Sequence, residues 1–342
     1  MGINLSDIVT LEPRTLGDFS GKVLAIDAFN TLYQFLAIIR QPDGTPLMDK
    51  RGRVTSHLSG LTYRLSNFVA AGIKPVFVFD GEPPKLKART IEGRVDVKRR
   101  AETEWKEALE IGDIATARSK AMQTSRLTGD MVEQSKRLLE LLGIPWVQAP
   151  AEGEAQASTM ARAGTAYAAA SQDFDSLLFG SPRLVKNLAI SGRRKLPRKE
   201  VYVDVQPEEI SLEATLSNLG ITREQLVDMG ILIGTDFNEG VKGIGPKKAL
   251  ALIKKHGALE GVLAELNVDI ESKEEVREIF LHPKVHESVD IEFKDPDPEG
   301  VRRMLCDEHD FSRDRIDTAL EKFVDARSSQ KQKSLDRWFG SG

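Results

Sequence analysis

Four short apolar runs, each followed by acidic residues, give the chain its main pattern. Residues 22–27 and 75–81 are two such runs, and each carries an aspartate at or near its end. Residues 144–147 and 165–170 are two more, bounded by Pro and Gly. Runs of this length predict buried strands. Because a helical segment connects the first two, we expect parallel strands in one sheet.

Apolar residues at helical spacing fill the segments between these strands. Residues 55–71 predict a helix that starts at Thr55 or Ser56 and stops at Gly72. Short strands are expected at residues 184–186 and 201–203, and a helical pattern beyond Pro207. The remaining signals are an apolar stripe at Met131, Leu138, Leu139 and Leu142, and a capping box at Thr222 and Gln225.

Six carboxylates stand at or just beyond the ends of the predicted strands. They are Asp27, Asp80, Glu152, Glu154, Asp173 and Asp175. Any single one could be a helix cap or a loop charge. Acids at four strand ends are explained more simply if all of them meet at one edge of the sheet, where α/β folds bind ligands. If the strand continues through Asp173 and Asp175, these two point to one face. The pattern predicts a divalent-metal site.

Residues 85–100 are strongly basic and nearly free of large apolar side chains. One interpretation is a solvated helical face. The other is a mobile basic segment that grips phosphates beside the acidic site. Gly93 and Gly112 weaken a single long helix, so we expect a flexible or bent arch. A second basic stretch, residues 191–199, is predicted to be a loop.

The glycine-rich residues 240–246 differ from a nucleotide-binding loop, because Pro246 follows Gly245 where that loop needs Lys and Ser or Thr. A tight hairpin that opens a helix, with Lys247 and Lys248 nearby, resembles a helix-hairpin-helix. Such an element holds a phosphate backbone without reading bases.

The last third predicts helices on the flank of the sheet over residues 270–326, with a charged, Pro-rich connection at 294–298. From residue 327 the composition is polar, and we expect disorder. Leu335, Trp338 and Phe339 share one helical face in this tail. They are either apolar tail residues without a role or a helical turn that inserts into a pocket on a partner protein.

Composition further limits the classes of protein to which the chain can belong. The 342 residues carry a formal net charge of −4 and a single cysteine, Cys306. That excludes an internal disulfide and Cys-based zinc sites, and it fits a reducing compartment. Residues 1–6 match a myristoylation pattern, but nothing polybasic follows. We therefore expect no membrane association, and a metal bound by oxygen.

The ordered set of motifs resembles the flap endonucleases, the structure-specific 5′ nucleases of replication and repair, in their archaeal form. The resemblance covers almost the whole chain and rests on residues 25–30, 79–84, 149–157, 172–175, 234–236 and 243–246, with a sliding-clamp-binding box in the tail.

The resemblance implies a set of site residues. The metal set gains a seventh carboxylate, Asp236, and the arch supplies Lys87 and Arg94 as catalytic cations. Tyr33 would stack on the base at the scissile position. The DNA-binding residues would be Gly2, Thr55, which meets a one-nucleotide 3′ flap, Gly243, Gly245, Lys247 and Lys248. The clamp-binding box would be Gln332, Leu335, Trp338 and Phe339.

The implied fold is α/β, with a mostly parallel twisted central sheet flanked by helices, a helical arch and a helix-hairpin-helix. One nuclease domain would cover residues 1–326. Its parts would be an N-terminal nuclease region (1–84), the arch (85–128), an internal nuclease region (129–235), the helix-hairpin-helix (236–268) and a helical flank (269–326), followed by a flexible tail (327–342).

The implied function is removal of 5′ flaps from branched double-stranded DNA, with 5′-3′ exonuclease activity, by two Mg²⁺ ions for which Mn²⁺ substitutes. A K⁺ ion at the helix-hairpin-helix, the sliding clamp PCNA as partner, a monomeric state and a cytoplasmic, nucleoid-associated location complete the expectation. The alternatives are a Mg²⁺-dependent phosphatase that uses Asp173 and Asp175, and a non-catalytic, clamp-bound DNA adaptor.

Overall fold

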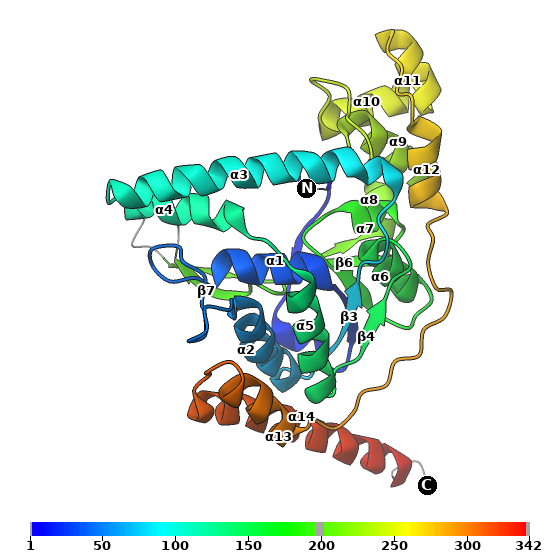
Figure 1. Cartoon of the computed structure of the whole chain (residues 1–342). Coiled ribbons are helices and arrows are strands. Elements are labelled where there is room, and N and C mark those ends of the chain that lie inside the picture. The colour runs from blue at the N-terminus through cyan, green and yellow to red at the C-terminus, as the bar shows by residue number, and fades with distance from the viewer. Residues whose placement is uncertain (1, 196–201, 340–342) are drawn as a thin grey trace.

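The fold is built on a seven-stranded, mostly parallel sheet (Figure 1). The computed structural model describes residues 2–195 and 202–339. The strand order is β1-β9-β6-β5-β2-β3-β4, with β1 and β9 antiparallel to their neighbours and the other pairs parallel. The strands are β1 Glu12–Pro13, β2 Val23–Asp27, β3 Lys74–Phe79, β4 Trp146–Gln148, β5 Ala168–Ala170, β6 Arg183–Lys186 and β9 Glu208–Ser211. The α/β class and the predicted parallel core are confirmed.

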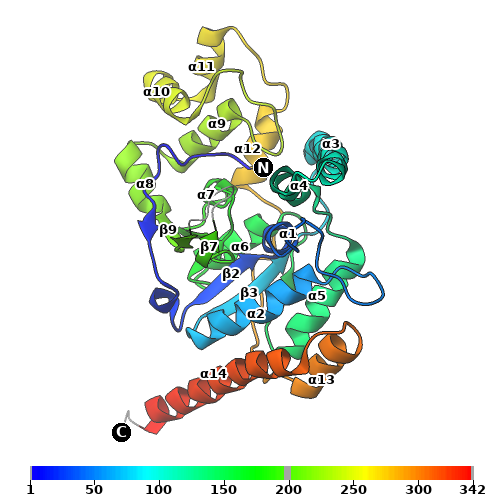
Figure 2. The ribbon, with the colours of Figure 1, turned by 90° about the vertical axis from the view of Figure 1, so that its left-hand side faces the viewer.

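Both faces of the central strands are buried, which explains their continuous apolar sequence. Along β2, Leu24 and Ile26 join one core cluster, while Ala25 joins another on the opposite face. Figure 2 shows α2 on the first face, with α14 packed outside it. A third core cluster holds the separate group of helices α8 to α12 at the other end of the molecule.

The helices follow the predicted spacing in most places. Their bounds are α1 Ala28–Ile38, α2 Ser56–Ala70, α3 Ala88–Glu110, α4 Ile114–Ala121, α5 Gly129–Leu141, α6 Gly153–Arg162, α7 Asp175–Leu178, α8 Leu212–Leu219, α9 Arg223–Ile233, α10 Pro246–His256, α11 Leu259–Leu266, α12 Lys273–Leu281, α13 Pro298–Arg302 and α14 Arg313–Phe339. The capping box of Thr222 and Gln225 is confirmed at the start of α9. Within the described residues, no helix is long and apolar enough to cross a bilayer.

The basic arch is straighter than the sequence predicted. Helix α3 runs for 23 residues through Gly93 without interruption, and Figure 1 shows it crossing the molecule with α4 folded back along it. A helical glycine costs only about 1 kcal/mol relative to alanine, which the helix tolerates at Gly93, and the C-terminal half of α3 is supported by ion pairs to Lys120 and Arg126. The predicted break falls instead at Gly112, whose φ of +73° follows the end of α3.

Two local predictions were wrong. Residues 191–199 were expected to form a loop, but β7 Gly192–Lys195 pairs with β8 Tyr202–Val205 as an antiparallel ribbon. The pattern beyond Pro207 was assigned as helical, yet residues 208–211 form β9 before α8 begins. Local apolar periodicity reveals neither strand, because β7 is itself polar and β9 pairs with β6, which is distant in the sequence.

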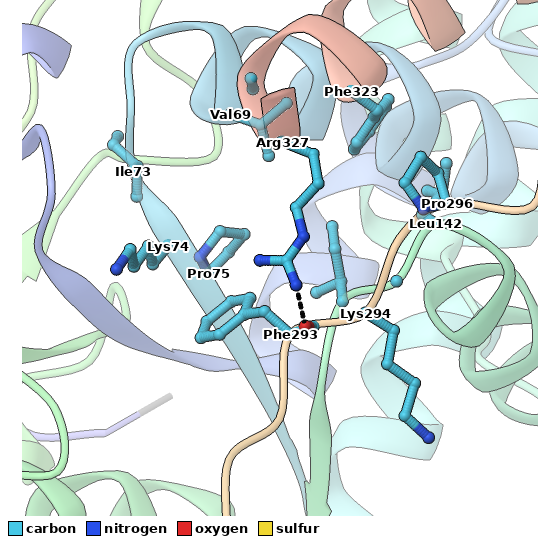
Figure 3. Close-up of a pocket in the computed structure, with 13 residues that line it drawn as sticks. Val69, Ile73, Lys74, Pro75, Leu142, Phe293, Lys294, Pro296, Phe323 and Arg327 are labelled. Carbon is cyan, nitrogen blue, oxygen red and sulfur yellow. Dashed lines mark hydrogen bonds between the residues drawn. The ribbon is translucent and has the colours of Figure 1, made fainter. Parts of the chain in front are cut away.

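The predicted helical flank is present, and a long extended strap over residues 282–297 leads into it. The backbone of Lys294 bonds to Gly143, and Arg327 of α14 donates to the carbonyl of Phe293 (Figure 3). A cavity of about 40 Å³ lies under this crossing, next to Lys74 and Ile144. These residues lie where β3 and β4 begin, so the cavity is at the opposite end of the strands from the acidic residues.

The tail also differs from expectation. Helix α14 continues through Phe339, where the sequence predicted a flexible segment from residue 327. The side chains of the predicted clamp-binding box, Gln332, Leu335, Trp338 and Phe339, lie outside what the structure describes, and so do residues 340–342.

Candidate metal centre and nucleic-acid interface

The seven predicted carboxylates come from the same edge of the sheet and from one neighbouring turn. Asp27 ends β2 and Asp80 follows β3. Glu152 is the N-cap of α6 and Glu154 lies in its first turn. Because β2, β3, β4 and β5 are parallel neighbours, their carboxyl ends meet. The remaining three acids are Asp173 and Asp175, after β5, and Asp236, after α9.

The predicted strand geometry of Asp173 and Asp175 was wrong. Strand β5 ends at Ala170, and Asp175 is the first residue of the short helix α7. The two carboxylates are therefore brought together by a turn, without strand alternation. The charge of Asp173 contributes to the raised pKa of Asp175.

Hydrogen bonds tie several of these acids to one another. The Ser171 hydroxyl lies 2.6 Å from Glu154 Oε1 and 3.2 Å from Asp27 Oδ2, so both acids touch one side chain. The amide of Gly153 donates to Asp80 Oδ1 at 2.7 Å. Sequence reasoning missed Ser171, although its place directly after β5 matches that of the acids.

Burial and mutual repulsion hold the protons of three acids far more tightly than usual. Burial, reinforced by the charge of Asp80, raises the pKa of Asp27 to about 8. Burial and the charge of Asp173 raise the pKa of Asp175 to about 7 and that of Glu154 well above its ordinary value. Such a group of acids is stable as carboxylates only when cations join it.

Two cations from the arch already lie among these acids. Lys87, just before α3, contacts Glu152 and lies 3.8 Å from Asp236. Arg94 on α3 donates to both oxygens of Asp236, at 2.7 and 2.6 Å. Burial pushes the pKa of Asp236 up, but Arg94 and Lys87 bring it below its ordinary value. The predicted catalytic cations are thus next to the predicted metal residues.

The donor set fits a divalent metal. It consists of carboxylate oxygens, the ligands preferred by hard cations such as Mg²⁺ and Mn²⁺. As the side chains stand, no group of three or more acidic, His or Cys residues in the described chain is arranged to hold an ion. Two of the acids, Glu152 and Asp236, pair instead with Lys87 and Arg94.

The first residues of the chain reach this centre. The amide of Ile3 donates to Asp175 Oδ1 at 2.8 Å. A Cβ on Gly2 would approach the Asp175 carboxyl group to 2.7 Å, which is closer than carbon atoms tolerate. Gly2, predicted as a DNA-binding residue, therefore lies directly against a candidate metal ligand.

Tyr33 on α1 faces the arch. The ammonium group of Lys98 on α3 lies 4.6 Å from the centre of its ring. Thr55, the other predicted substrate residue of this region, is the N-cap residue of α2 and is buried. Its side chain makes no cap hydrogen bond, and Ser56 instead bonds to the backbone of Leu47 and Ile39.

The segment predicted as a helix-hairpin-helix joins two helices through a glycine-containing turn. Helices α9 and α10 flank it, Gly243 has a φ of +83°, and Gly245 is the N-cap of α10 with Pro246 behind it. No atom lies within 4 Å of a Cβ placed on Gly243 or Gly245, so the backbone there is open to a ligand. The exposed Lys247 and Lys248 follow at the positive end of α10.

Comparison with known proteins supports a single family. The XPG N-terminal domain model matches residues 2–102, and the XPG I-region model matches residues 143–236. Flap endonuclease 1 of Aeropyrum pernix is 55% identical and covers 99% of this chain and 100% of its own length. The flap endonuclease-1 structure from Methanococcus jannaschii is 40% identical, with a TM-score of 0.76 over 96% of this chain and 100% of its own. The catalytic core of Rad2 in complex with DNA substrate shares the fold, with a TM-score of 0.70 at 23% identity over 95% of this chain and 100% of its own.

The matched regions define the class first: residues 2–102 and 143–236 carry the N-terminal and I-region domains of XPG-type nucleases. Full-length identity above 50% then makes the assignment specific, and the chain belongs to the flap endonuclease 1 family. Members of this family depend on metal ions, so a divalent metal requirement follows for this chain.

Proposed function

We propose that this protein is a metal-dependent nuclease that cleaves DNA phosphodiester bonds at 5′ flaps, with accompanying 5′-3′ exonuclease activity, in replication and repair. The observation that carries the proposal is the convergence of seven carboxylates beneath a basic arch. A hydrolase of small phosphate esters would have little use for a basic arch beside its acidic residues. The family assignment gives the same answer independently.

The metal residues would be Asp27, Asp80, Glu152, Glu154, Asp173, Asp175 and Asp236, with two Mg²⁺ ions as the natural cofactor and Mn²⁺ as a substitute. When bound, such a pair supplies a nucleophile from water at neutral pH and stabilises charge on the leaving 3′ oxygen. The chain's own task is to keep the carboxylates ionised and correctly oriented, and Ser171, Gly153 and Ile3 donate the hydrogen bonds that do so.

Lys87 and Arg94 would act on the scissile phosphate. In the DNA-free protein they pair with Glu152 and Asp236. With these acids holding metal ions, Lys87 and Arg94 would be free to stabilise the charge that develops on the phosphate. Tyr33, which already accepts a cation on its ring face, would then stack on the adjacent base.

Substrate choice would come from shape. The open backbone at Gly243 and Gly245, with Lys247 and Lys248, would hold duplex phosphates without reading bases, and a K⁺ ion would bind the hairpin carbonyls. Thr55 would contact a one-nucleotide 3′ flap. The single 5′ strand would pass under α3, which excludes bulk duplex from the acids.

A substrate panel tests this function. We expect rapid Mg²⁺-dependent incision of a 5′-flap oligonucleotide, slower attack on a blunt 5′ end, and no hydrolysis of a small phosphate ester such as p-nitrophenyl phosphate. Hydrolysis of the ester without flap incision would establish a phosphatase. Tight flap binding without incision under any metal would establish a DNA adaptor.

We also propose that the protein works as a monomer and that its tail binds the sliding clamp PCNA through Gln332, Leu335, Trp338 and Phe339. The three apolar residues of this set share a helical face, which suits insertion into a pocket. Phe339→Ala should abolish clamp pull-down and leave clamp-free cleavage intact. Unchanged pull-down would remove the tail from the clamp interface.

A further inference from the structure

Asn30 connects two of the carboxylates through two different groups. Its backbone amide donates to Asp27 Oδ1 at 3.0 Å, and its side-chain Nδ2 donates to Asp173 Oδ2 at 3.1 Å. Asp27 ends β2, and Asp173 follows β5, the neighbour that pairs with β2. Asn30 lies in the first turn of α1, so this helix reaches acids from two adjacent strands.

Gln34 fixes the orientation of the Asn30 amide. It lies one turn further along α1, and its Nε2 donates to Asn30 Oδ1. An ionised carboxylate only accepts hydrogen bonds, so Asn30 must turn its NH₂ group toward Asp173 and its oxygen toward Gln34. The three side chains therefore form a directed chain from Gln34 through Asn30 to Asp173.

The side-chain oxygen of Gln34 shows that this orientation of the two amides costs folding stability. Its Oε1 is buried and has no hydrogen-bond partner among the described residues, beside a cavity of about 10 Å³. A buried, unpaired acceptor destabilises the fold. Turning the amide over would bring Oε1 against Asn30 Oδ1 and remove the donor. The Nε2 group of Gln34 therefore stays directed at Asn30 Oδ1, and Asn30 Nδ2 in turn stays directed at Asp173.

The side chain of Asn30 is not needed to start α1. The capping bond at this end joins the Asp27 carboxylate to the backbone amide of Asn30, which any residue except proline supplies. Asparagine is also a weaker helix former than leucine. The fold alone therefore gives no reason for an amide at this position.

We propose that Asn30 and Gln34 are positioning residues that hold Asp173 in the orientation in which it binds the divalent metal. The inference rests on the proposed function and names two residues that serve its metal centre without touching substrate. Groups that orient metal ligands typically change metal affinity or activity about 10–100-fold when they are removed.

The test compares Asn30→Leu and Gln34→Leu with Thr31→Val as the matched control. Thr31 is buried on the same helix and lines the same cavity, and none of its described hydrogen bonds reaches a carboxylate. Mn²⁺ affinity is measured by electron paramagnetic resonance without DNA. We expect about 10–100-fold weaker binding for Asn30→Leu, a smaller loss for Gln34→Leu, and wild-type affinity for Thr31→Val.

A second measurement distinguishes the loss of Asp173 positioning from a general loss of folding stability. Single-turnover flap cleavage by both leucine variants should fall at limiting Mn²⁺ and recover at saturating Mn²⁺, while their urea midpoints stay at or above the wild-type value. Unchanged Mn²⁺ affinity in both variants, or an equal loss in Thr31→Val, would overturn the proposal. If the affinities change as expected but the wild-type protein cleaves no flap, the proposed function fails and the positioning role stands.

Discussion

At the scale of single residues, Asp27 serves the fold and the candidate site together. It caps α1 through the amide of Asn30, and it is one of the acids whose pKa is raised, to about 8, by burial and by Asp80. From the sequence, a helix cap and a metal ligand were alternative roles for Asp27. The structure shows the cap, and the second carboxylate oxygen of Asp27 faces Ser171 and the acidic centre.

The raised pKa values of Asp27 and Asp175 predict how stability depends on pH. A carboxyl group whose pKa is higher in the folded state stabilises the fold while it is protonated, and this contribution is lost as the pH rises through the folded value. In the folded protein the pKa of Asp27 is about 8 and the pKa of Asp175 is about 7. The urea midpoint of the metal-free protein should therefore fall from about pH 6.5 to about pH 8.5.

This window avoids the buried His57, whose pKa is lowered by burial to about 4 and which affects stability only at lower pH. Asp27→Asn keeps a good helix cap and removes one titration, so its midpoint should fall less steeply. Divalent metal should raise the wild-type midpoint more at pH 8.5 than at pH 6.5. A wild-type midpoint that is flat or rises across the window contradicts the proposed burial of these acids.

At the scale of elements, the arch brings its cations to the acids because α3 starts just after β3. Among the described side chains of the arch region, Lys87 and Arg94 pair with the acidic centre, and the segment carries many more basic residues. Lys85 is exposed in the same turn as Lys87. Lys85 and Lys87 carry the same charge at different positions, so comparing variants of the two residues tests the effect of position alone.

Lys87→Ala should slow single-turnover cleavage by about 10²–10³-fold, the usual effect of losing a group that stabilises transition-state charge. Binding of flap DNA in Ca²⁺, measured by fluorescence anisotropy, should weaken much less. Lys85→Ala removes the same charge and should cleave at nearly the wild-type rate. If Lys87→Ala loses affinity but keeps its rate, the residue is only a phosphate anchor.

Sequence patterns predicted the elements that depend on local signals. The parallel core strands, α2 and the capping box of α9 were all predicted, since apolar periodicity and caps are encoded in neighbouring residues. The strand at residues 201–203 was predicted and corresponds to β8, but β9 and β7 were missed: β9 pairs with the distant β6, and β7 is a polar strand without apolar alternation. The continuity of α3 through Gly93 was also missed, because a single helical glycine costs only about 1 kcal/mol and does not by itself end a helix.

Candidate site residues were predictable where a strand end marks them. Six acids were found by their position alone, while Asp236 lies in a turn after α9 and required the family resemblance. Ser171, Asn30 and Gln34 were missed, because their roles appear only when side-chain hydrogen bonds to the acids are known. The side chains of the tail box are not described, so its role stays a prediction.

At the scale of the whole molecule, three separate parts meet around one edge of the sheet. The sheet presents the acids, the arch lies across them, and α9 leads into both Asp236 and the hairpin that would hold duplex DNA (Figure 1). Thr90 on α3 donates to the carbonyl of Asp236 at 2.8 Å, which links the arch to the helix-hairpin-helix.

The measurement that tests this account most directly is cleavage of a 5′-flap oligonucleotide in Mg²⁺ by the wild-type protein and by Asp175→Ala. Asp175 touches the backbone of Ile3 and lies beside Asp173, so its loss removes a metal ligand while the hairpin and arch remain. The account predicts that flap binding survives and that cleavage falls by several orders of magnitude. Near-normal cleavage by Asp175→Ala would contradict it.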